Sequence, residues 1–165
     1  MNGTASSSSG TSQRAWVGVV LGGLVAGFFD ISYAIISWTL HDPPRSPLWV
    51  LQSVATGLLG AKSFDGGVPA GLLGLFCHFV IAFGASVTYY LASRKIALLR
   101  ERPVIAGAIF GILVFLFMNW VVIPLAACPF TIPFTASVLA RGFLSHAVLI
   151  GIPIALLQKR FSGTR

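Results

Sequence analysis

Four long runs of apolar residues constrain the fold of this chain more than any other feature of its sequence. They cover Ala15–Leu40, Val68–Ser93, Val104–Ile123 and Ser137–Gln158. Each is long enough to cross the roughly 30 Å hydrocarbon core of a bilayer as a helix. Because lipid offers no hydrogen-bond partner to the peptide backbone, a segment that crosses the bilayer as one continuous apolar run must be helical. The sequence therefore predicts an all-α polytopic membrane protein, with four transmembrane helices packed as a bundle of two hairpins.

The composition agrees with a lipid environment. Hydrophobic residues make up 56% of the chain and charged residues only 9%, whereas soluble domains carry about 25% charged residues. The net charge of +7 arises from basic residues that flank the apolar runs, without a basic stripe interleaved with aromatic residues. Nucleic-acid binding is therefore not expected, and the lipid bilayer is the expected partner.

The chain is expected to consist of a transmembrane domain between two short tails. Residues 1–14, rich in Ser, Thr and Gly, are expected to be a disordered tail; residues 15–158 form the transmembrane domain, and residues 159–165 form a basic tail. The first apolar run is too long for the core of a signal peptide, so it is expected to remain as the first span.

The Lys and Arg residues predict the orientation. Eight lie on the side of the two termini (Arg14, Arg94, Lys95, Arg100, Arg102, Lys159, Arg160 and Arg165), and three on the other (Arg45, Lys62 and Arg141). Since cytoplasmic loops carry an excess of basic residues, both termini are expected in the cytoplasm.

The first outer loop contains a short helical segment. Prolines within His41–Pro47 stop the first span, and Leu48–Gly60 is helical in character but too short to cross a bilayer. Trp49 suits the headgroup region, so we expect a helix lying in the outer interface, with a re-entrant segment as the alternative.

Two pairs of glycines spaced by four residues occur within spans, in Gly23–Gly27 and Gly107–Gly111. Such pairs allow helix backbones to approach closely, so helix packing is their expected role. The segment Gly23–Gly27 resembles Gly107–Gly111, and Gly74–His78 resembles Gly142–His146. These similarities suggest a pseudo-repeat of two parallel hairpins.

Each span contributes one polar residue at a similar depth in its outer half, and together we name Asp30, His78, Asn119 and His146 the polar layer. Ionisable residues within a span are costly, by at least ~2.5 kcal/mol, and mark either a functional site or a buried partner. Three interpretations stay open: hydrogen bonds that fix helix register, a site responsive to a proton or small ion, and bis-histidine ligation of a haem by His78 and His146.

Other chemistry has weaker support in the sequence. Cys77 and Cys128 lack a recognisable metal-ligand spacing with the histidines, so no metal site is predicted. No motif of enzymatic catalysis is present, so no enzyme is expected. Arg141 and Arg45, near the outer side, are candidates for contact with an anionic headgroup, and snorkelling to the interface is the alternative for Arg141.

Several short segments resemble the YagU-type family of small bacterial inner-membrane proteins. They are Gly22–Gly27 leading to Pro43–Pro47, His78–Phe83 leading to Tyr89 and Tyr90, Ala106 and Gly107 leading to Pro124 and Leu125, and finally His146 with Lys159 and Arg160. The first outer loop of this chain is shorter and more apolar than that of the family. The resemblance implies a multi-pass helical protein of the inner membrane, with no catalytic residues to carry over.

The leading functional hypothesis is a non-enzymatic membrane protein that binds or conducts a proton or small ion through the polar layer. A conducting pathway would need a homo-oligomer, because four spans enclose little space. The alternatives are a haem-binding electron-transfer protein and an accessory subunit of a larger membrane complex.

Overall fold

The computed structural model describes residues 7–131 and 133–161, and all the regular structure within these ranges is helical. Four helical stretches are long and apolar enough to cross a membrane: Arg14–Thr39, Gly67–Lys95, Pro103–Leu125 and Ala136–Phe161. Their ends differ from the predicted runs by only a few residues. For the described residues, the predictions of an all-helical fold and of four potential spans are confirmed.

The four stretches differ in regularity. The first two are the continuous helices α1 (Ser7–Thr39) and α3 (Gly67–Lys95). The third comprises α5 (Pro103–Phe117), a π-helical turn η2 (Met118–Val122) and α6 (Ile123–Leu125). The fourth comprises α7 (Ala136–Ser145), a π-helical turn η3 (His146–Gly151) and α8 (Ile152–Phe161). A short helix α4 (Ala97–Glu101) connects α3 to α5.

The beginning of α1 differs from the prediction of a disordered tail over residues 1–14. The helix starts at Ser7, so residues 7–14 continue the first span as helix. This segment contains no proline, and extending an existing helix is far easier than nucleating a new one. Residues 1–6 of the expected tail, and residues 162–165 of the expected basic tail, lie outside the described residues.

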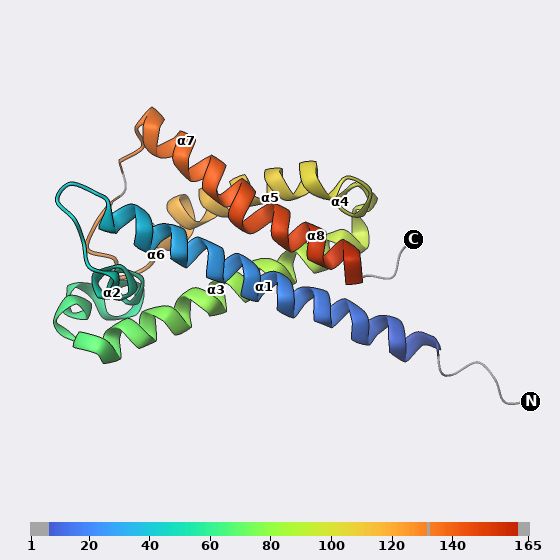
Figure 1. Cartoon of the computed structure of the whole chain (residues 1–165), viewed down its shortest axis with the longest axis horizontal. Coiled ribbons are helices and arrows are strands. Elements are labelled where there is room, and N and C mark those ends of the chain that lie inside the picture. Colours follow the sequence, from blue (N-terminus) through green and yellow to red (C-terminus); the bar gives the residue numbers. More distant parts are fainter. Residues whose placement is uncertain (1–6, 132, 162–165) are drawn as a thin grey trace, which may run out of the picture.

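The helix expected at Leu48–Gly60 is α2 (Pro47–Leu59), followed by a 3₁₀ helix η1 (Gly60–Asp65). Ser46 caps α2 by accepting a hydrogen bond from the backbone N–H of Trp49 at 3.1 Å. Figure 1 shows α2 running across the end of the molecule where α1 finishes and α3 starts. There it packs so closely on α3 that a Cβ at Gly74 would collide with the Leu51 carbonyl group.

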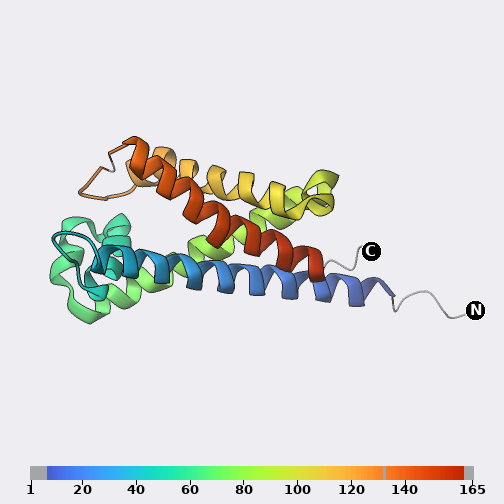
Figure 2. The same ribbon diagram turned by 45° about the horizontal axis from the view of Figure 1, so that its top comes forward.

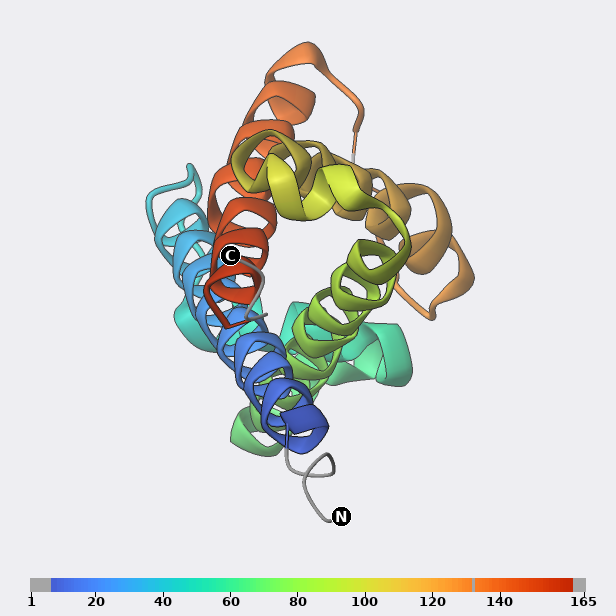
Figure 3. The same ribbon diagram turned by 90° about the vertical axis from the view of Figure 1, so that its right-hand side faces the viewer.

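The spans pack in the spatial order α3, α1, fourth span, α5. Helix α1 lies between α3 and the fourth span, and α5 packs on η3 and α8 rather than on α3. Figure 2 and the end-on view of Figure 3 let this order be followed around the molecule. A small core lies where these elements meet, formed by Ala26, Tyr89, Ile150, Ile154 and Ala155.

Candidate functional site

Three members of the predicted polar layer lie on the neighbouring elements α1, α3 and η3. The Nε2–H of His78 donates a hydrogen bond to the carbonyl oxygen of Gly27 at 2.9 Å, which joins α3 to α1. Asp30 and His78 both lie close enough to His146 to interact with it electrostatically. We name Asp30, His78 and His146 the titratable cluster.

The glycines of α1 bring α3 close enough for this contact. A Cβ at Gly27 would lie 2.8 Å from Cε1 of Phe79, and a Cβ at Gly23 would lie 2.5 Å from Cδ1 of Phe83. The two aromatic rings therefore occupy the space left by the missing side chains. Because Asp30 is one turn beyond Gly27, the same approach places its carboxyl group on the face toward the other spans.

His146 is held by the π-helical turn that it begins. Its Nδ1 lies 3.2 Å from the Oγ of Ser145, and its ring packs edge-on against Phe115, with the centroids 5.0 Å apart. A Cβ at Gly111 of α5 would collide with the His146 carbonyl group, so α5 lies directly on the backbone of η3. Single π-helical turns inside α-helices occur frequently at functional sites.

Asn119, the fourth member of the predicted polar layer, forms its hydrogen bond within its own span. It lies in η2, is 8% exposed, and its Nδ2 donates to the Phe115 carbonyl oxygen at 2.8 Å. Within the described chain, its Oδ1 is buried without a hydrogen-bond partner. Phe115 thus links Asn119 to the titratable cluster, because its carbonyl oxygen accepts from Asn119 and its ring lies against His146.

A second buried polar group escaped the sequence analysis. Ser86 of α3 donates from its Oγ to the Val19 carbonyl oxygen at 2.8 Å. The Nε2 of Gln158 donates to the Ser86 carbonyl oxygen at 2.7 Å and lies 3.1 Å from the Ser86 Oγ. One sequence feature could have indicated this contact, namely a further glycine pair with a spacing of four, Gly18 and Gly22. In the structure a Cβ at Gly22 would lie 2.9 Å from the Ser86 Oγ, so the missing side chain makes room for Ser86.

The two arginines proposed as headgroup contacts lie apart from this junction. Both are exposed. The Arg45 guanidinium lies over the Trp49 ring, 4.9 Å from its centroid, and Trp49 in turn stacks on Phe64. Arg141 lies on α7. Arg45 therefore already has an aromatic partner that orients its charge.

One ring nitrogen of His78, a candidate haem ligand, is already engaged in a hydrogen bond. Its Nε2 could bind haem iron only after the bond to the Gly27 carbonyl oxygen is broken. Over residues 7–131 and 133–161, no three His, Cys, Asp or Glu side chains are grouped so as to hold a metal ion. Cys77 and Cys128 are both free thiols, and the Cys128 Sγ lies 3.6 Å from the Thr56 hydroxyl oxygen.

Comparison with known proteins gives this chain no relative. No protein-family model, no curated protein and no solved structure matches it. Its function must therefore be argued from the titratable cluster and the helices that hold it.

Proposed function

We propose that this chain is a four-span protein of the bacterial inner membrane, with both termini in the cytoplasm, whose titratable cluster takes up and releases a proton. Membership of the YagU-type family is part of this proposal and agrees with the same topology. The proposal is of a binding protein rather than an enzyme. The observation that carries it is that Asp30 of α1 and His78 of α3 both lie within electrostatic range of His146 in the fourth span.

The outward-facing side chains support a membrane location. Large hydrophobic residues of the spans are turned outward, such as Phe28 (61% exposed), Phe76 (67%) and Leu144 (67%). Soluble proteins rarely expose contiguous apolar surfaces of this kind. The basic residues next to α4 lie at the same end as both termini (Figure 1), which favours a cytoplasmic location for that end.

The residue types of the titratable cluster favour a proton as the ligand. Histidine is the side chain whose ordinary pKa, about 6.5, lies nearest physiological pH, which is why it commonly holds or passes on protons in membrane proteins. A carboxylate in the low-dielectric interior interacts strongly with a nearby imidazolium, and Asp30 is within electrostatic range of His146. The charge on His146 therefore changes the attraction between α1 and the fourth span, which couples proton binding to helix packing.

The apolar core favours binding over conduction through one chain. The Ser86 and Gln158 group contacts α1 at Val19, two helical turns before Gly27, which corresponds to about 12 Å along the helix. Between these levels lies the core that includes Ala26 and Ile154, both 0% exposed. The one polar group among the described residues of this core is the Tyr89 hydroxyl, and it already donates to the Leu99 carbonyl oxygen at 2.8 Å.

The proposal is tested by titrating the histidines of the purified protein in nanodiscs. The chain has three histidines, and NMR of ¹⁵N-labelled imidazoles follows each one separately. We expect Asp30→Asn to shift the titration midpoint of His146 while leaving exposed His41, in the outer loop, unchanged. Equal midpoints for His146 in the wild type and the variant would rule out a coupled proton site.

A further inference from the structure

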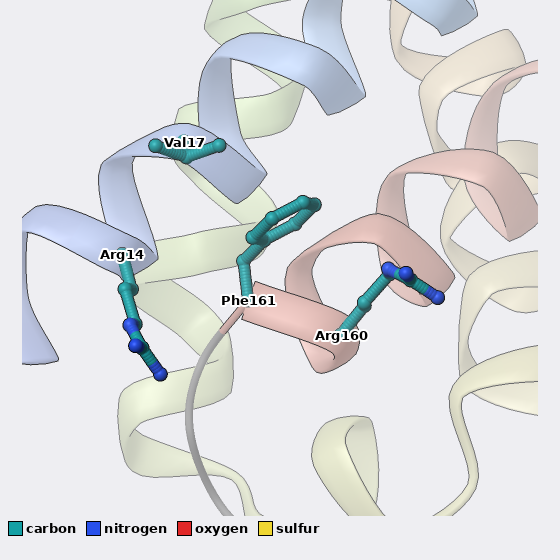
Figure 4. Close-up of a pocket in the computed structure, with 4 residues that line it drawn as sticks. All are labelled: Arg14, Val17, Arg160 and Phe161. Carbon is teal, nitrogen blue, oxygen red and sulfur yellow. The ribbon is translucent and has the colours of Figure 1, made fainter.

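An open pocket lies between α1 and the end of α8, at the end of the molecule that carries the termini. Its volume is about 380 Å³, and it is lined by Arg14, Val17, Arg160 and Phe161. Figure 4 shows the Phe161 ring between the two arginine side chains, one from each helix. The pocket therefore combines two cationic groups with an apolar wall.

Over residues 7–131 and 133–161, neither guanidinium group in this pocket faces a neutralising partner. Arg14 and Arg160 are exposed, and within the described residues neither has a hydrogen bond or an ion pair. The whole chain has only four acidic residues, of which Glu101 alone lies at this end. The pocket thus offers two positive charges to an external anion.

An aromatic pair fixes the level of this pocket relative to a membrane. Trp16 and Tyr90 lie next to it on α1 and α3, with ring centroids 5.8 Å apart. Tryptophan and tyrosine concentrate at the headgroup level of membrane proteins. The arginines therefore sit where lipid phosphates lie, while Val17 (42% exposed) and Phe161 form the apolar part.

We propose that this pocket binds the phosphate group of an anionic phospholipid from the leaflet at the basic end. Guanidinium groups bind phosphate oxygens in a bidentate manner, and basic pockets between transmembrane helices on the cytoplasmic side hold acidic headgroups. Val17 and Phe161 contact the glycerol and the first acyl carbons. A soluble phosphate would gain nothing from this apolar wall.

The test measures binding of dioleoylphosphatidylglycerol to the full chain in detergent by native mass spectrometry. Each basic residue near an anionic lipid contributes about fivefold in affinity, so Arg14→Gln with Arg160→Gln should weaken binding about thirtyfold. The single variant Arg160→Gln should weaken it about fivefold. The matched control, Arg94→Gln with Arg102→Gln, removes the same charge from the same end outside the pocket, and should weaken binding less than about threefold.

Four results would overturn the proposal. Equal weakening by the pocket and control variants would indicate diffuse attraction to the basic end, and no weakening by the pocket variants would place lipid elsewhere. Equal affinity for dioleoylphosphatidylcholine would show that charge is not recognised. Equally tight binding of glycerol phosphate would identify a site for soluble anions. Because both arginines are exposed, circular dichroism should show unchanged helix content in every variant.

Discussion

The close contact between α5 and η3 gives a quantitative prediction for Gly111→Ala. The new Cβ would lie 2.6 Å from the His146 carbonyl carbon and 2.7 Å from the Ala147 Cα, whereas ordinary contacts are 3.4–4 Å. Both neighbours are main-chain atoms that cannot rotate away, so α5 must retreat from η3 by nearly an ångström. Overpacking of this kind costs about 1–3 kcal/mol.

Gly84→Ala is the matched control, because its Cβ would meet nothing within 4 Å. Replacing an unconstrained helical glycine by alanine stabilises a helix by roughly 0.5–1 kcal/mol. The free energy of unfolding of the two variants should therefore differ by about 2 kcal/mol or more. The assay is reversible unfolding in mixed micelles with increasing dodecyl sulfate, followed by circular dichroism. Equal stabilities for Gly111→Ala and Gly84→Ala would refute the direct packing of α5 on η3.

Three further predictions concern the buried polar group, the topology and the cofactor. Ser86→Ala should lower the free energy of unfolding by about 1 kcal/mol in the same assay, because it removes the hydrogen bond to the Val19 carbonyl oxygen; an unchanged stability would argue against this bond. In a background lacking the two native cysteines, Ala97→Cys should react with a membrane-impermeant maleimide only in inverted vesicles, and Ala61→Cys only in right-side-out vesicles. The reverse pattern would invert the proposed topology. The purified protein should show no Soret band, and a band that disappears in His78→Ala would establish haem binding.

Hydropathy predicted the four long apolar helices well, because a run of this length and hydropathy is expected to cross lipid, where the backbone has no alternative to a helix. Similar depth along the helices singled out Asp30, His78 and His146, and in the structure Asp30 and His78 both lie within electrostatic range of His146. Depth alone does not show which side of its helix a residue such as Asn119 faces, because that side depends on the rotation of the helix. That rotation is set by tertiary packing.

The irregular features could not be predicted from the apolar pattern. A π-helical turn such as η3 inserts one residue into a helix, and a uniformly apolar run shows no change of period where this happens. The contact between Ser86 and Gln158 joins α3 to α8. Nothing in the sequence distinguishes these two residues from other polar residues at helix interfaces. The helical start at Ser7 was missed because Ser and Thr are typical both of tails and of exposed helix ends.

The most direct test of the titratable cluster is the pH dependence of the Asp30 carboxyl group, measured by infrared difference spectroscopy of the protein in nanodiscs. The band of the Asp30 carboxyl group is the one that disappears in Asp30→Asn, which distinguishes it from the bands of the other acidic residues among the four in the chain. Our account predicts a band that appears on acidification and whose midpoint shifts in His146→Gln but not in the outer-loop control His41→Gln. An Asp30 band with the same midpoint in His146→Gln and in the wild type would contradict a shared proton site.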